Sequence, residues 1–225
     1  MFFPIGDDQV QGGSKPIISY GFIATNVLVF LYQYSLVGSD SDQDFVLTWG
    51  AIPQEISHGV DLQTLLTSMF LHGGWMHLIG NMMFLWVFGD NIEAVIGSVR
   101  FFIFYVLGGI AAGLAQVVLN AESLTPCVGA SGAIAAVLGA YLVMFPGSKI
   151  KVLFLLFFTS FQVPALYFLG FWALQQFMNG YTALGAATSD TSGVAWWAHI
   201  GGFVFGAAAG FLFRTQVKTH NDFVG

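Results

Sequence analysis

One serine and one histidine of this sequence lie in apolar segments, where polar side chains are costly to bury. Ser131 belongs to a Gly-Ala-Ser-Gly motif at residues 129–132, and His199 lies in the apolar segment 196–202. A serine hydroxyl becomes a nucleophile when a neighbouring base removes its proton, and imidazole suits that task near neutral pH. The pair predicts hydrolysis within a membrane, provided that the fold brings the two side chains together.

An earlier segment carries the other polar groups that such a reaction needs. His77 and Asn81 are four residues apart and therefore share one face of a helix. A tetrahedral oxyanion is stabilised by preorganised donors, which His, Asn and backbone N–H groups can supply. We expect His77, Asn81 and the Ser131 amide to form an oxyanion hole. The acidic residues of that segment lie at its far end, so the expected catalytic group is a Ser131–His199 dyad.

The composition is that of an integral membrane protein. Of the 225 residues 56% are hydrophobic and 8% are charged, whereas about a quarter of the residues of a soluble protein are charged. A formal net charge of −6 makes nucleic acid an unsuitable partner. The single cysteine, Cys127, excludes an internal disulfide and a multi-cysteine metal site. We expect no cofactor and no metal, and we expect Cys127 to be a small buried hydrophobe.

Six apolar stretches are long enough to be transmembrane helices, which need about 20 residues to cross about 30 Å of hydrocarbon. They are residues 17–37, 67–89, 100–119, 127–146, 152–178 and 194–213. The sequence therefore predicts an all-α membrane protein with a six-transmembrane-helix bundle. Its parts would be a short cytoplasmic lead (1–16), the six-helix domain (17–214) and a cytoplasmic tail (215–225).

Basic residues predict the orientation, because Lys and Arg favour cytoplasmic loops. All of them fall on one side of the six-helix arrangement: Lys15, Arg100, Lys149, Lys151, Arg214 and Lys218. Both termini are then cytoplasmic, in a pattern that suits a bacterial plasma membrane, although an organellar membrane also fits. The outer loop 38–66 is long and partly apolar, so we expect it to have structure of its own.

Ser131 and His199 are expected at a similar depth in the membrane and on helix faces that can meet. Ser131 and His199 each lie four or five residues into an inward-running span, so both are in the outer half of the bilayer. Small residues at every fourth position let membrane helices approach closely. Such stripes follow both side chains: Ser131, Ala135 and Gly139 in one span, and Gly202, Gly206 and Gly210 in the other. We therefore expect the two spans to pack through these faces.

The remaining intramembrane polar residues have simpler expected roles. His72 lies five residues before His77, so it points elsewhere, and we expect it to make a structural hydrogen bond. Gln116, Gln175 and Gln176 either tie helices together or line a water path, and a tie between helices is the default expectation.

Together, the motifs around Ser131, His199 and His77 to Asn81 resemble those of the rhomboid family of intramembrane serine proteases, in its basic six-helix prokaryotic form. The resemblance runs over nearly the whole chain. It implies that Ser131 is the nucleophile, His199 the general base, and His77, Asn81 and the Ser131 amide the oxyanion hole. It further implies cleavage of the transmembrane segments of other membrane proteins near the outer face.

The sequence departs from the family pattern at two places. The first outer loop has no arginine, although many members have a Trp-Arg pair there, and Ala135 stands where some members place a tyrosine under the histidine. Other functions remain as alternatives. One is a non-catalytic rhomboid-like binder of transmembrane helices, which would be expected to lack the Ser or the His. A haem-binding electron carrier and a transporter are disfavoured by the small-residue stripes and by the absence of paired inverted repeats.

Overall fold

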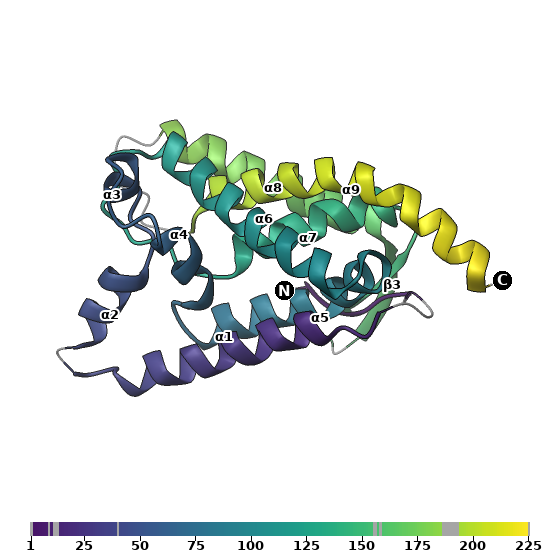
Figure 1. Cartoon of the computed structure of the whole chain (residues 1–225), viewed down its shortest axis with the longest axis horizontal. Helices are drawn as coiled ribbons and strands as arrows, with labels where there is room; N and C mark the ends of the chain where they lie inside the picture. The colour runs from purple at the N-terminus through teal and green to yellow at the C-terminus, as the bar shows by residue number, and fades with distance from the viewer. Residues whose placement is uncertain are drawn as a thin grey trace.

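Six long helices dominate the computed structural model, which describes residues 2–8, 10, 14–39, 41–154, 157, 159–185 and 194–224. Figure 1 shows them running along the long axis of the molecule. They are α1 (Ile17–Ser35), α5 (Trp75–Ile96), α6 (Ser98–Leu119), α7 (Ser131–Met144), α8 (Ala165–Gly185) and α9 (Trp196–Val224). Each overlaps one predicted apolar stretch. Within the described residues, α1, α6 and the part of α9 up to Val217 are long and apolar enough to cross a membrane, and α7 is a shorter apolar helix.

A small sheet corrects the prediction of an all-α fold. Strands β2 (Lys149–Phe154) and β3 (Thr159–Pro164) pair antiparallel, and β1 (Phe2–Gly6) pairs with the other edge of β2. The span predicted at 152–178 was therefore wrong at its start, because α8 begins only at Ala165. Ile150 and Val152 are buried, whereas Lys149 and Lys151 are exposed. This period of two is the pattern of a strand with one covered face.

The residues near both ends of the sequence also form regular structure. The residues predicted as a short lead supply β1, whose Phe3 pairs with Leu153 of β2. The residues predicted as a tail continue α9 as far as Val224. The fold is thus mostly helical, with the sheet at one end of the helices (Figure 1).

The long segment between α1 and α5 has its own structure, as expected. It forms α2 (Ser41–Trp49), α3 (Pro53–Ser57), α4 (Thr64–Thr67) and the 3₁₀ helix η1 (Ser68–Phe70). A reciprocal pair of backbone hydrogen bonds joins it to Cys127, in the chain that leads into α7: Ala51 N–H to Cys127 O at 3.0 Å, and Cys127 N–H to Ala51 O at 2.8 Å. A third runs from Gly129 N–H to Ser68 O at 2.9 Å. The segment therefore fixes the backbone just before Ser131.

Helix α7 is the buried centre of the bundle and packs most extensively against α9. A methyl group at Gly206 would clash with the carbonyl oxygen of Ala136, and one at Gly139 would clash with that of Phe203. The two backbones are therefore in contact, which only glycine permits at these positions. This confirms the prediction that the small-residue stripes face each other.

Near the C-terminal end of α5, the buried carboxylate of Glu93 joins three helices. Glu93 accepts hydrogen bonds from Ile18 N–H at 2.9 Å and Ser19 N–H at 2.8 Å, which are in the first turn of α1. It also accepts from the hydroxyls of Ser19 at 2.8 Å and Ser98 at 2.6 Å. A negative charge at a helix N-terminus is favourable because it meets unpaired N–H groups and the positive end of the helix dipole.

The basic residues lie at the same end of the helix bundle as Glu93 and the sheet. Lys149 and Lys151 lie in β2, and Arg100 in the first turn of α6 donates a hydrogen bond to Gln216 Oε1 of α9 at 3.3 Å. Lys15 is next to Ser14, whose N–H donates to Ala94 O at 3.2 Å. Ser131 begins α7 at the opposite end of the bundle.

Candidate active site

The fold brings Ser131 and His199 into direct contact. Ser131 is the first residue of α7 and His199 lies in the first turn of α9. The Nε2 atom of His199 lies 2.8 Å from the Ser131 hydroxyl oxygen, which is hydrogen-bond distance. The close packing of α7 on α9 accounts for this contact, because both side chains project from the ends of helices whose backbones touch. This is the geometry that a serine needs to transfer its proton to an imidazole.

A third side chain, from α8, holds the other side of the imidazole. Gln176 Oε1 lies 2.9 Å from His199 Nδ1, and Gln176 Nε2 donates to Trp172 O at 3.3 Å. Because the amide oxygen can only accept, Nδ1 of His199 carries the ring proton. Its Nε2 atom then presents a lone pair to the Ser131 hydroxyl. The expectation that Gln176 ties helices together is confirmed, whereas its specific partner was missed.

The rings around His199 come from two tryptophans rather than from α7. The Trp172 ring centroid lies 5.9 Å from that of His199 and is tilted by 37°, and the Trp196 ring lies 6.2 Å away at 90°. Ala135, where some family members have a tyrosine, is fully buried in α7. The support that the sequence lacks at Ala135 is thus supplied from α8 and from the start of α9.

His77 and Asn81 lie beside Gly129, two residues before Ser131. Gly129 has φ of +127°, and a methyl group there would lie 2.8 Å from His77 Nε2 and 3.5 Å from Asn81 Nδ2. Gly73 N–H donates to His77 Nδ1 at 3.3 Å, so Nε2 of a neutral His77 carries the proton and faces this chain. Asn81 Nδ2 is buried and has no acceptor among the described residues. Two donors therefore stand near the start of α7.

The Ser131 amide completes the set of expected donors. Helix α7 has no side-chain cap at its N-terminus, and the N–H groups in the first turn of a helix have no partner within the helix. The amide can therefore donate to a negative oxygen held above Ser131. The structure brings together all four residues expected at the site: Ser131, His199, His77 and Asn81.

A cavity of about 550 Å³ lies over these residues, within the size range of ligand pockets. Its walls come from α5, α7, α8, α9 and the chain before α7. It is lined by Gly73, Met76, His77, Gly80, Asn81, Phe84, Cys127, Val128, Ser131, Ile134, Leu138, Trp172, Val194, Ala195 and His199. Polar groups are few and are concentrated around Ser131, while the rest of the lining is apolar and suits an apolar peptide segment.

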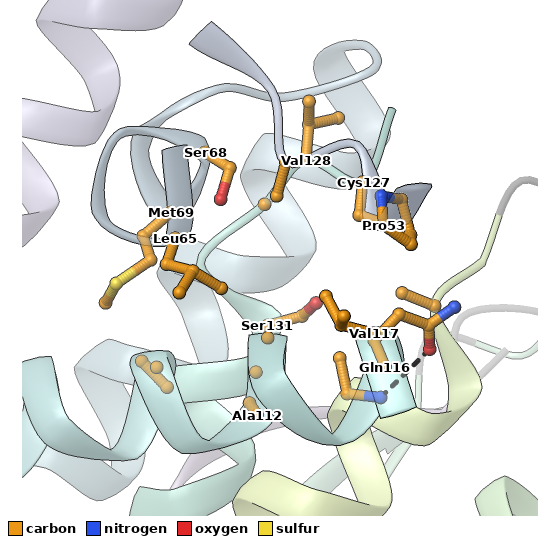
Figure 2. Close-up of a pocket in the computed structure, with 18 residues that line it drawn as sticks. Pro53, Leu65, Ser68, Met69, Ala112, Gln116, Val117, Cys127, Val128 and Ser131 are labelled. Atoms are coloured by element: carbon orange, nitrogen blue, oxygen red, sulfur yellow. Dashed lines mark hydrogen bonds between the residues drawn. The ribbon is translucent and has the colours of Figure 1, made fainter. Parts of the chain in front are cut away.

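A second and smaller cavity, of about 40 Å³, lies on the α6 side of Ser131. Figure 2 shows it between Ala112, Gln116 and Val117 of α6 and the chain that leads to Ser131. One water needs about 10–15 Å³ on this measure, so the cavity has room for about three. Gln116 Oε1 accepts from Ala198 N–H at 3.2 Å (Figure 2), which ties α6 to α9 beside His199.

Cys127 lines the cavity, but it lacks the properties of a catalytic thiol. Cys127 is half-buried, and burial raises the pKa of its thiol, which disfavours the reactive thiolate. Within the described part of the chain, no three His, Cys, Asp or Glu side chains come together as a metal site would require.

His72 differs from its expected placement. Its ring meets that of His77 edge-on, with centroids 5.1 Å apart, instead of pointing away. Its backbone, rather than its ring, makes the structural hydrogen bonds: Gln33 accepts from His72 N–H at 3.1 Å and donates to His72 O at 2.9 Å. His72 is fully buried, and neither ring nitrogen has a partner among the described residues.

Comparison with known proteins gives the family. Residues 60–216, most of the chain and all four site residues, match the Rhomboid domain. Rhomboid protease GluP of Bacillus subtilis is 34% identical over 128 residues, which are 57% of this chain and 24% of that protein. The mitochondrial Rhomboid protein 1 of Saccharomyces cerevisiae is 29% identical over 204 residues, 88% of this chain and 54% of that protein.

A human relative has a similar extent of match. The mitochondrial presenilin-associated rhomboid-like protein is 28% identical over 196 residues, 83% of this chain and 45% of that protein. The chain thus spans between about a quarter and about half of the length of these relatives. From the domain match and the apolar helices together, this chain is an integral membrane protein that belongs to the rhomboid family.

Proposed function

We propose that this chain is an intramembrane serine endopeptidase, which hydrolyses peptide bonds in or near the transmembrane segments of other membrane proteins. The observation that carries the proposal is the 2.8 Å contact between Ser131 Oγ and His199 Nε2 at the wall of a largely apolar cavity. Membership of the rhomboid family, and the similarity to a relative named as a rhomboid protease, support it.

In the first half of the reaction, Ser131 Oγ attacks the carbonyl carbon of the scissile peptide bond while its proton passes to His199 Nε2. The carbonyl oxygen becomes negative and is stabilised by donors from the Ser131 amide, His77 Nε2 and Asn81 Nδ2. Collapse of this tetrahedral intermediate breaks the C–N bond. His199 returns its proton to the leaving amine, and the remaining acyl group is esterified to Ser131.

In the second half, a water molecule attacks the ester carbon and gives a proton to His199 Nε2. The second tetrahedral intermediate then releases the carboxylic acid, and the proton returns to Ser131 Oγ. The 40 Å³ cavity beside Ser131 supports this step, because it offers room for water at the serine while the lining of the larger cavity is mostly apolar.

The proposal includes the arrangement in the membrane. All six long helices cross it, both termini are cytoplasmic, and the site is near the outer face. The gathering of basic residues at the sheet end supports this orientation. Apolar side chains exposed along α8, such as Leu166, Phe171 and Phe177, suit contact with lipid or with a substrate helix. Because the relatives include bacterial and mitochondrial proteins, the proposal does not choose between these membranes.

Cleavage of a labelled single-span protein by the purified chain in detergent tests the proposal. We expect cleavage by the wild type, and a loss of roughly 10⁶-fold in turnover in Ser131→Ala or His199→Ala. Equal cleavage by Ser131→Ala would exclude the dyad. Retention of the substrate helix without cleavage by the wild type would favour the alternative of a non-catalytic binder.

A further inference from the structure

We propose that Gln176 is a positioning residue for this reaction, so that the site is a Ser131–His199–Gln176 array rather than a dyad. The inference rests on the proposed function. Its structural basis is a chain of two hydrogen bonds through one ring, from Gln176 Oε1 to His199 Nδ1 at 2.9 Å and from His199 Nε2 to Ser131 Oγ at 2.8 Å.

The orientation of the Gln176 amide is fixed at both of its ends. Its Nε2 group donates to Trp172 O, one turn earlier in α8, at 3.3 Å, and this leaves the oxygen directed at His199. Gln176 is 5% exposed, so water does not compete for these groups. An amide held in this way accepts only from a protonated Nδ1. It therefore selects the tautomer of His199 whose Nε2 can take the proton of Ser131.

A neutral amide has the properties that this position requires. In serine proteases with a carboxylate as third member, that group holds the imidazole in the correct tautomer and orientation, and papain-like proteases use an asparagine in the same place. A buried carboxylate at this depth of a membrane protein would be costly. Gln176 provides the orienting hydrogen bond without a buried charge.

The position of Gln176 also makes α8 part of the catalytic assembly. Ser131 and His199 come from α7 and α9, which are locked together by their glycine contacts, whereas Gln176 comes from a separate helix. Trp172, on the same face of α8, packs its ring near that of His199. The imidazole is therefore oriented only when α8 is seated against α9.

Three variants separate this role from packing. Gln176→Leu keeps a similar size and removes the acceptor, whereas Gln176→Glu keeps an acceptor oxygen at the same reach in either protonation state. Gln175→Leu is the matched control, because the neighbouring side chain is exposed and lies outside the site. Each variant is measured for kcat and KM with the single-span substrate. In parallel, ¹⁵N NMR of the His199 ring, assigned with His199→Ala, reports which nitrogen is protonated.

We expect Gln176→Leu to lower kcat on the order of 10²–10³-fold with KM changed by less than about threefold, a smaller loss than the roughly 10⁴-fold seen when a charged third member is altered. Gln176→Glu should recover most of that loss, and Gln175→Leu should match the wild type. His199 should be protonated at Nδ1 in the wild type and should become a mixture of tautomers in Gln176→Leu.

Wild-type kcat and an unchanged tautomer in Gln176→Leu would overturn the inference. Equal losses in Gln176→Leu and Gln176→Glu would also overturn it, because packing and not the acceptor would then be the cause. The proposed function fails separately, if Ser131→Ala cleaves as fast as the wild type. In that event the tautomer measurement still decides whether Gln176 positions the ring.

Discussion

Two polar clusters lie at opposite ends of this bundle, and they differ in how completely their hydrogen bonds are made. At the sheet end, the Glu93 carboxylate accepts four hydrogen bonds and is fully buried. At the other end, Asn81 Nδ2 has no acceptor among the described residues, α7 has no side-chain cap, and Asn81 and Ser131 both line a cavity of about 550 Å³. Unpaired donors of this kind are costly in a buried site.

Under the proposed function, this difference separates groups that stabilise the fold from groups that take part in a reaction. Glu93 joins α1, α5 and α6, so its hydrogen-bonding capacity is used in the resting structure. In the proposed mechanism, Asn81 and His77 keep donors free for a charge that forms only when a substrate is attacked, which is how preorganised donors stabilise a transition state. Mutations at the two ends should therefore affect different quantities: stability at the sheet end, and turnover at the serine end.

Among the variants that compare the two ends, the largest expected effect is on stability, in Glu93→Ala. Two backbone N–H groups and two hydroxyls lose a charged acceptor, so the free energy of unfolding should fall by about 3–5 kcal/mol. Denaturant unfolding of the protein in detergent measures this change in the free energy of unfolding. Glu93→Gln, which retains one acceptor oxygen, should lose less. Turnover per folded molecule should remain that of the wild type, and a specific loss of turnover would break the distinction between the two ends.

The converse variant is Asn81→Ala. Loss of one oxyanion donor should lower kcat by about 10²–10³-fold, or about 2.7–4 kcal/mol, while stability is unchanged or slightly raised because an unpaired buried group is removed. Asn26→Ala is the matched control, since Asn26 is a buried asparagine of α1 whose Oδ1 is also unpaired. We expect it to leave kcat unaltered. An unchanged kcat in Asn81→Ala would remove Asn81 from the site.

A smaller effect is expected from Gly129→Ala. The added methyl group meets the His77 ring at 2.8 Å and forces an alanine to adopt φ of +127°. Strain of this kind costs about 1–3 kcal/mol, and displacement of His77 should lower kcat as well. Gly38→Ala separates the two causes, because Gly38 has φ of +84° and open space around it. If both variants keep full turnover, His77 does not act beside Gly129.

The smallest effect is a pH dependence at the sheet end. Burial raises the pKa of the Asp7 carboxyl above its ordinary 3.8, and hydrogen bonds from Tyr141 and Asn91 offset this only in part. A carboxyl whose pKa is raised in the folded state is a source of instability as pH rises through the window above 3.8. Asp7→Asn should remove this loss, so that stability falls less as the pH rises above 3.8. If the free energy of unfolding depends on pH in the same way in the wild type and in Asp7→Asn, this prediction is wrong.

Much of the fold follows from periodicity and small-residue stripes in the sequence. The six long helices, the close packing of α7 on α9 at Gly139 and Gly206, and the contact between Ser131 and His199 all rest on local patterns that were readable in advance. The start of α8 was misplaced, because the apolar residues of β2 and the residues of β3 pair as antiparallel strands instead of forming the first turns of a helix. Only the alternation of Lys149 to Val152 indicated strands.

The partner of His199 could not be predicted in the same way. Gln176 is 23 residues from His199 in the sequence and comes from a different helix, so no spacing rule relates them. The sequence offers one indirect indication: with Ala135 in place of a tyrosine, α7 has no aromatic ring to support the imidazole of His199. This indicates that another group must orient the ring, but only the packing of α8 on α9 identifies that group as Gln176.

The most direct test of the account is covalent labelling of Ser131. A fluorophosphonate reacts with a serine only when a base activates it, so we expect the purified wild type to carry the adduct on Ser131, located by mass spectrometry of peptides. His199→Ala and Ser131→Ala should remain unlabelled although both are folded. Equal labelling of Ser131→Ala, or an adduct on a residue other than Ser131 in the wild type, would contradict the central claim.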